Sequence, residues 1–206
     1  MKKLSILLLS IVSLGVAASA QSNKDYNINF KQRASLYAAT SIADSNALGG
    51  FGGSSNAPQP VNSKSKLNRI DIFIDTSKTV VYHKEYNGYK LSLINNTDSI
   101  TGFEAVDSRL SIISEVFYKG KWQAIEYLPS SWCGNSYHTV YLKPNEFWSF
   151  NIPKFTGEIY TKLRYKLNIG NGKTIFSNEI EASFNKGQLN KKEGHSPKGI
   201  MDPYNE

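Results

Sequence analysis

Residues 159–169 alternate between two sets of side chains, one mainly apolar and one mainly polar. Leu163 and Leu167 fall on one side of this pattern, and Lys162 and Lys166 fall on the other. Because successive side chains of a β-strand point to opposite faces, a period of two predicts a strand with one buried and one solvated face. Such strands pair antiparallel, and the Gly-Asn-Gly segment at 170–172 provides a turn to the next strand.

The same kind of pattern recurs along the chain and predicts about nine strands. The segments that carry it are 70–74, 79–83, 89–93, 110–118, 122–128, 137–142, 148–152, 159–169 and 176–184. No amphipathic helix interrupts them. Since antiparallel sheets with one apolar face pack against each other, the sequence predicts an all-β antiparallel β-sandwich over residues 67–185.

The two ends of the chain differ in composition from this region. Residues 1–20 combine a basic start, an apolar run over 4–16 and a small-residue site at 18–20, which is the pattern of a secretory signal peptide. The apolar run is shorter than the ~20 residues of a membrane helix. We therefore expect an exported protein, periplasmic or extracellular, with no transmembrane segment after the signal is removed.

Gly, Ser, Asn and Pro dominate residues 49–65, and residues 186–206 are similarly polar. Such segments bury too little apolar surface to offset the entropy lost on ordering. The sequence thus predicts a flexible leader over residues 21–66, with some helical character at 34–43, and a disordered tail over residues 186–206.

Charge and cysteine content exclude some classes of protein. The net charge of +7 falls to +5 when the two lysines of residues 1–20 are removed, and the basic residues are spread along the chain. Nucleic-acid binders cluster such residues, so we expect no nucleic-acid partner. Cys133 is the single cysteine, so no internal disulfide can form and the apolar core must hold the fold together. This composition fits a bacterial exported protein better than a disulfide-rich module.

Three motifs in the strand region resemble bacterial immunoglobulin-like domains, a group that includes a proteinase-inhibitor family. They are Gly-Lys-Trp at 120–122, Leu-Lys-Pro-Asn-Glu at 142–146, and Gly-Glu-Ile-Tyr at 157–160. Asn145 replaces the usual glycine of the second motif, and Ile159 separates the acidic residue from Tyr160 in the third. The resemblance covers roughly residues 70–184 and implies an immunoglobulin-like sandwich. Its motifs belong to the fold and not to an active site.

Two surfaces are candidate binding sites. The first is the loop over residues 130–138, where we single out Trp132, Asn135, Tyr137 and His138. Aromatic residues on a loop at one end of a sandwich are typical of binding surfaces. The alternative is that Trp132 covers the end of the core.

The second candidate is a row of three cations on one face of a strand: Lys162, Arg164 and Lys166. This row would suit an anionic glycan or an acidic partner. The alternative is a solvated face, neutralised by cross-strand partners such as Glu179 and Glu181.

Motifs of catalysis and metal binding are absent from the sequence. Cys133 and His138 lie five residues apart, but structural zinc sites need four ligands in recognisable pairs. The acidic residues are mostly single, and we predict no metal, no cofactor and no catalytic residue. Whether the Cys133 thiol is reactive is left open. Asn95-Asn96-Thr97 matches the N-glycosylation pattern, which is too short to be specific.

From these features we expect a non-catalytic binding or adhesion protein at or outside the bacterial cell envelope. Its partner would be an unknown protein or an anionic glycan of that envelope. The alternatives are a secreted proteinase inhibitor, implied by the resemblance, and a hydrolase with an unrecognised site.

Overall fold

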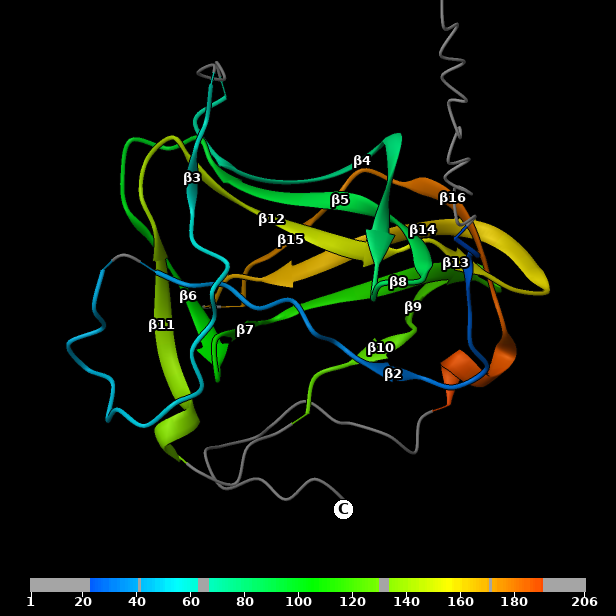
Figure 1. The fold of residues 1–206 in the computed structure, drawn as a ribbon, viewed down its shortest axis with the longest axis horizontal. Helices are drawn as coiled ribbons and strands as arrows, with labels where there is room; N and C mark the ends of the chain where they lie inside the picture. Colours follow the sequence, from blue (N-terminus) through cyan, green and yellow to red (C-terminus); the bar gives the residue numbers. More distant parts are fainter. Residues whose placement is uncertain (1–22, 41, 63–66, 130–133, 171, 191–206) are drawn as a thin grey trace, which may run out of the picture.

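The chain is nearly all β-structure in the computed structural model, which describes residues 23–40, 42–62, 67–129, 134–170 and 172–190 (Figure 1). The described residues contain strands and two short 3-10 turns, η1 (Gly134–Ser136) and η2 (Lys186–Leu189), but no α-helix. None of these residues forms a helix long and apolar enough to cross a membrane. The predicted all-β antiparallel sandwich is confirmed.

One main sheet has the strand order β3-β12-β5-β4. Its members are β3 (Gln59–Pro60), β4 (Ile70–Tyr82), β5 (Tyr86–Asn95) and β12 (Glu146–Pro153). All neighbours in this sheet pair antiparallel. The segments predicted at 70–74 and 79–83 form one strand, β4, whose register shifts between Asp75 and Val80.

The second main sheet is centred on β14 (Ile159–Asn168), the strand with the clearest alternation. On one side β14 pairs with β8, which pairs with β9, and on the other side it pairs with β15 and β16. The bounds are β8 (Ile112–Tyr118), β9 (Lys121–Ala124), β15 (Thr174–Phe176) and β16 (Ile180–Phe184). A tight hairpin turn joins β8 to β9, with Lys119 and Gly120 at positive φ.

A third, smaller sheet continues the first beyond a corner. It has the order β11-β6-β7, formed by β6 (Thr101–Val106), β7 (Arg109–Leu110) and β11 (Tyr137–Leu142). Strands β5 and β6 are consecutive in the chain. Strand β12 pairs with β5, and β11 pairs with β6. Figure 1 shows this sheet at the left end of the molecule.

Asn95 holds the corner together. Its side chain is buried, and its Nδ2 donates to the carbonyl oxygens of Ser99 (2.8 Å) and Leu142 (2.9 Å). Its Oδ1 accepts from the backbone N–H and the hydroxyl of Thr97. The amide that the glycosylation motif would offer for modification is therefore enclosed in the fold.

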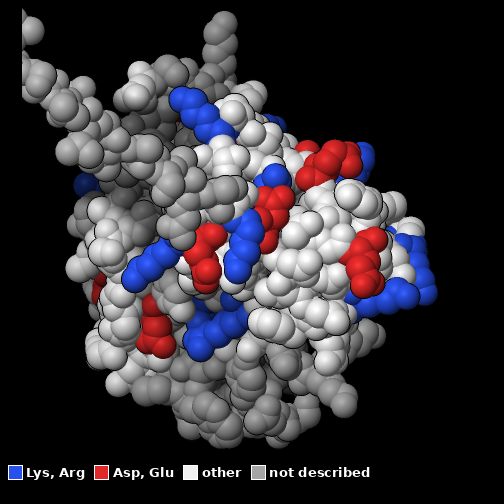
Figure 2. All heavy atoms as spheres, turned by 45° about the vertical axis from the view of Figure 1, so that its right-hand side comes forward, with Lys and Arg blue, Asp and Glu red and all other residues white. Residues whose placement is uncertain are grey.

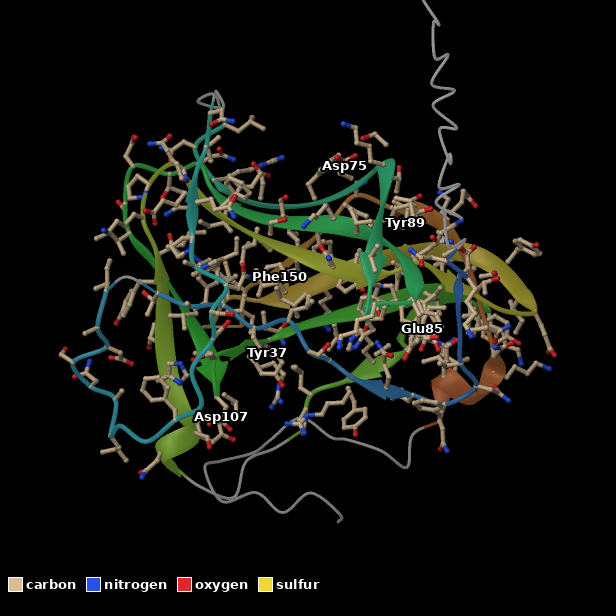
Figure 3. All side chains as sticks on the ribbon, viewed as in Figure 1. Tyr37, Asp75, Glu85, Tyr89, Asp107 and Phe150 are labelled. Atoms are coloured by element: carbon tan, nitrogen blue, oxygen red, sulfur yellow. The ribbon has the colours of Figure 1, made fainter. Side chains whose placement is uncertain are left out.

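The core lies between the sheets, where the alternating positions of the strands meet. Trp148 and Phe150 on β12 and Leu163 and Tyr165 on β14 belong to one buried cluster, and Phe103 on β6 extends it under the third sheet. Figure 3 shows Phe150 in the middle of the molecule. The predicted alternation therefore places the expected side chains inside.

The prediction of a flexible leader over 21–66 is wrong for its described residues. Strand β1 (Tyr26–Asn27) pairs with β13 (Phe155–Thr156), β2 (Gln32–Arg33) with β10 (Glu126–Tyr127), and β3 with β12. Leu36 and Ala38 lie in the core and alternate with less buried neighbours, so 34–40 is extended and not helical. The sandwich thus includes β1, β2 and β3 together with Leu36 and Ala38, because backbone hydrogen bonds and buried apolar side chains offset the entropy of ordering these segments.

The predicted tail differs in part as well. Residues 186–189 form η2, and Gln188 is fully buried. Residues 191–206, like the predicted signal peptide, lie outside the described residues.

Candidate functional site

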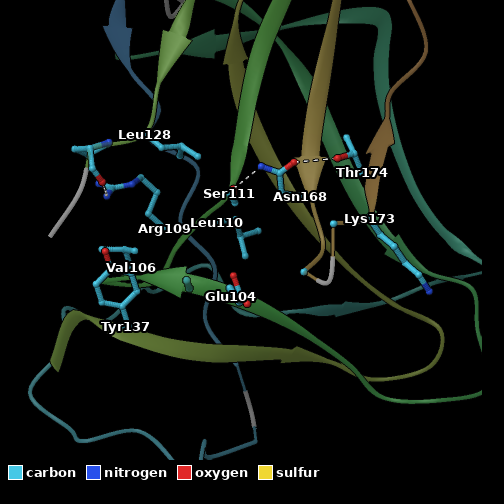
Figure 4. A pocket seen from close by; sticks show the side chains of 14 residues that line it. Glu104, Val106, Arg109, Leu110, Ser111, Leu128, Tyr137, Asn168, Lys173 and Thr174 are labelled. Carbon is cyan, nitrogen blue, oxygen red and sulfur yellow. Dashed lines mark hydrogen bonds between the residues drawn. The ribbon is translucent and has the colours of Figure 1, made fainter. Parts of the chain in front are cut away.

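A cavity of about 470 Å³ opens between the third sheet and the turn that joins β14 to β15 (Figure 4). Its apolar lining comes from Ala105, Val106, Leu110, Leu128 and Pro129. Its polar lining comes from Glu104, Arg109, Ser111, Tyr137, Asn168, Lys173 and Thr174. Ligand sites are commonly concave, largely apolar and furnished with a few polar groups, and this cavity has that character.

Arg109 is the most unusual residue of the lining, because it is a charged side chain with only 3% of its surface exposed. It opens β7 directly after a turn in which Asp107 and Ser108 both have positive φ. Its Nη2 donates to the carbonyl oxygen of Pro129 at 3.3 Å. Its Nη1 is buried and has no hydrogen-bond partner among the described residues.

The electrostatic surroundings of Arg109 are unfavourable for its charge. Burial, and then the nearby Arg33 guanidinium, lower the pKa of Arg109, while a side-chain hydrogen bond with Tyr37 and the charges of Tyr37 and Asp107 oppose this in part. Figure 3 shows Tyr37 and Asp107 in the lower left part of the view, below Phe150. Because an arginine remains protonated in proteins, the result is a buried cation with an unused donor.

Tyr137 supplies a second unused group on the same cavity. It is the first residue of β11 and pairs in register with Val106. Its hydroxyl is buried and has no hydrogen-bond partner among the residues that the structure describes. Figure 4 shows Arg109 and Tyr137 on one side of the cavity.

The facing wall is polar and internally bonded. Asn168 Nδ2 donates to the hydroxyl of Ser111 (3.3 Å), and the hydroxyl of Thr174 donates to Asn168 Oδ1 (3.1 Å), as drawn in Figure 4. Gly170 and Gly172, both at positive φ, shape the adjoining turn. The polar groups of this wall are hydrogen-bonded to one another, whereas Arg109 and Tyr137 on the opposite side each have a donor without a partner among the described residues.

The structure divides the predicted binding loop. Trp132 and Cys133 lie outside the described residues, and Asn135 is exposed on η1. Tyr137 lines the cavity. His138 points elsewhere: it is buried, and Phe51 stacks on its ring with the centroids 3.7 Å apart.

His138 and Ser108 are close enough to resemble a catalytic pair, but their contacts are structural. Ser108 Oγ lies 3.4 Å from His138 Nε2 and donates to the carbonyl oxygen of Gly52 at 2.8 Å. The backbone N–H of Gly52 donates in turn to Asp107 Oδ1. These contacts clamp the glycine-rich segment 49–53 onto the third sheet.

The predicted cationic row is paired with acidic residues. Lys162 contacts Glu179 at 3.0 Å, and Glu115 contacts both Arg164 (3.0 Å) and Lys166 (3.7 Å). The Arg164 guanidinium also lies over the rings of Trp122 and Phe176, at 4.1 and 3.8 Å. Figure 2 shows basic and acidic side chains interleaved on the face that it draws. The predicted pairing of Lys162 with Glu179 is present, and the row is not a free cationic patch.

Sequence reasoning missed Arg109. Asp107-Ser108-Arg109 has the composition of an ordinary polar turn, and the burial of Arg109 comes from segments that lie far from it in the chain. Tyr37 forms an isolated antiparallel β-bridge with Arg109, and the backbone N–H of Leu110 donates to the carbonyl oxygen of Leu36. The sequence offered no local signal of this packing, because the segment around Leu36 was expected to be flexible.

Among the residues that the structure describes, no group of three or more His, Cys, Asp or Glu side chains is arranged to hold a metal ion. A comparison with models of protein families found no match, and comparisons with curated proteins and with solved structures found none either. The immunoglobulin-like resemblance therefore stays a prediction from the sequence motifs.

Proposed function

We propose that this chain is an exported, non-catalytic binding protein that takes a small ligand, or one group of a larger envelope component, into the Arg109–Tyr137 cavity. The observation that carries the proposal is that two residues in the lining of one cavity, Arg109 and Tyr137, each hold a buried donor, Nη1 and the hydroxyl, that lacks a partner among the described residues. Buried polar groups in folded proteins are nearly always satisfied, and each exception calls for an explanation.

The cost of leaving these donors unpaired favours a bound partner. Leaving one buried donor unsatisfied costs about 1–3 kcal/mol, and more when the group is charged. A site that binds a ligand accepts such a cost in the free protein, because the ligand then supplies the missing acceptors. A purely structural arginine at this position would be expected to satisfy Nη1 as well as Nη2, which donates to the Pro129 carbonyl oxygen.

The contacts of Ser108 support the non-catalytic part of the proposal. A serine nucleophile must pass its proton to a base, whereas the Ser108 hydroxyl donates to the Gly52 carbonyl and Phe51 covers the His138 ring. The proteinase-inhibitor and hydrolase alternatives gain no specific observation from the described residues. The partner expected from the sequence, a protein or an anionic glycan of the envelope, would be held through a group that enters the cavity.

Ligand-observed NMR with a library of small fragments tests this proposal. We expect fragments that bind the purified protein and lose binding in Leu128→Trp, which fills the cavity from its apolar wall. Leu48→Trp is the matched control, because Leu48 is 76% exposed and away from the cavity lining. Fragments that bind Leu128→Trp as well as they bind the original protein, with both variants folded, would contradict the proposal.

A further inference from the structure

We infer that the cavity recognises a carboxylate, carried by a small organic acid with an apolar body, and that Arg109 and Tyr137 are the groups that bind it. This inference rests on the proposed function and names the class of ligand. It follows from the kind of polar group left unsatisfied, the number of such groups, and the lining of the remaining space.

The unused groups select for an acceptor with negative charge. A guanidinium has donors only, and a phenol hydroxyl is a ready donor to an oxygen. Placed in a buried site, Arg109 is a cation whose charge is poorly compensated, since burial dominates its surroundings and Arg33 adds a second positive charge nearby. An anion that reaches Nη1 therefore gains both a hydrogen bond and a Coulomb attraction in a medium less polar than water.

The small number of donors favours a carboxylate over a phosphate. Phosphate groups carry up to two charges and several oxygens, and proteins bind them with clustered cations or series of backbone N–H groups. Here Nη2 already donates to the Pro129 carbonyl oxygen, and the donors without a partner among the described residues are the N–H groups of Arg109 Nη1 and the Tyr137 hydroxyl. One guanidinium nitrogen and one hydroxyl suit the two oxygens of a carboxylate.

The charges around the cavity are consistent with a single negative charge on the ligand. Arg109 and Lys173 belong to the lining, and Glu104 is the acidic residue of that lining. Asp107 contributes a further negative charge near Arg109. With the nearby Arg33, three positive charges face two negative ones, so a monoanion would balance this arrangement and a dianion would leave one negative charge in excess.

The rest of the cavity suits an apolar body. Ala105, Val106, Leu110, Leu128 and Pro129 contribute apolar surface next to the Arg109 side, and the volume of about 470 Å³ lies within the range of small-molecule sites. The Ser111–Asn168–Thr174 wall can contact one polar group at the other end of the ligand.

The test compares an acid with its neutral isostere. Isothermal titration calorimetry on the purified full-length protein would use 3-phenylpropanoate and 3-phenylpropanamide as probes. We expect the acid to bind about 10- to 100-fold more tightly, the usual effect of charge-assisted hydrogen bonds in a buried site. A second pair, acetyl-Ala-Ala-Phe as the free acid and as the amide, distinguishes a free small acid from the end of a peptide as the source of the carboxylate.

Variants locate the carboxylate. Arg109→Met should remove the preference for the acid over the amide. Tyr137→Phe should weaken binding of the acid more than it weakens binding of the amide. Lys173→Met is the control, because Lys173 is an exposed cation of the same cavity. A preference that survives Arg109→Met and is lost in Lys173→Met would overturn the inference.

The outcomes separate the two proposals. Equal binding of the acid and the amide would refute carboxylate recognition and leave the binding cavity standing. No binding of any probe, together with no fragment hit in the cavity, would refute both. The comparison of acid and amide on the unmodified protein decides the inference even if Arg109→Met fails to fold.

Discussion

Replacing Arg109 by methionine should leave the free energy of unfolding unchanged or raise it by up to about 2 kcal/mol. The substitution removes a buried guanidinium whose desolvation costs several kcal/mol, and methionine keeps an unbranched apolar stem. It also removes the 3.3 Å hydrogen bond to the Pro129 carbonyl, a loss of about 1–3 kcal/mol. The two effects are similar in size, so the balance is near zero or favourable.

Arg164→Met is the matched comparison, since the same substitution there should have the opposite sign. Arg164 donates to Glu115 Oε2 from two nitrogens, at 3.2 and 3.0 Å, and stacks between Trp122 and Phe176. Its removal leaves the nearly buried Glu115 with only Lys166 at 3.7 Å. We expect a loss of about 2–4 kcal/mol, slightly below the usual cost of breaking a buried pair.

Urea unfolding at pH 7, followed by tryptophan fluorescence with comparison of m-values, measures both changes. We expect the urea midpoint of Arg109→Met to equal or exceed that of the original protein, and the midpoint of Arg164→Met to be lower. If Arg109→Met lowers the free energy of unfolding by more than about 2 kcal/mol, Arg109 is a structural residue whose donors are satisfied in the free protein. A ligand would then not be needed to explain its burial.

Three further predictions concern the surrounding framework. Burial raises the pKa of Glu126, so the folded protein favours its protonated form; stability should fall as pH rises from about 4.5 through that raised pKa, and Glu126→Gln should abolish this slope in urea titrations at several pH values. Asn95→Ala should lower the free energy of unfolding by about 2–4 kcal/mol, because it leaves two carbonyl oxygens at the corner without their donor, and a loss below 1 kcal/mol would contradict this role. Phe51→Ala should speed proteolytic cleavage within residues 49–53 by uncovering His138, and an unchanged cleavage rate would show that the clamp does not depend on the stacked rings.

Strand positions could be predicted from the sequence where a strand has one buried and one solvent-exposed face. The alternation in 159–169 gives β14 within one residue, and Leu163, Tyr165 and Leu167 are buried as expected. Strand β6 (Thr101–Val106) was missed, because Gly102 and Glu104 interrupt its apolar character and only Phe103 and Ala105 face the core.

The N-terminal segment shows why composition alone misleads. Glycines and small polar residues predict flexibility, but here each short strand gains a partner from the body of the sandwich, and Leu36 gains a place in the core. These contacts join residues far apart in the chain, so no local pattern reveals them. The same applies to Arg109, which is buried by the segment that passes Tyr37.

Of the predicted site residues that the structure describes, only Tyr137 lines the cavity that we consider the candidate site. The cationic row was recognisable as a row, and Glu179 could be named as a partner of Lys162 from cross-strand pairing, but Glu115, which contacts Arg164 and Lys166, was not named as a partner. The burial of His138 under Phe51 could not be foreseen, since Phe51 belongs to the glycine-rich segment.

The most direct test of the binding cavity is NMR of the arginine side chains during a titration with 3-phenylpropanoate. Our account predicts that the Arg109 side-chain signals shift saturably, together with the ring signals of Tyr137, while those of Arg164 stay in place. Shifts that concentrate on Arg164 and its neighbours, or an Arg109 signal that does not move at saturating ligand, would contradict it.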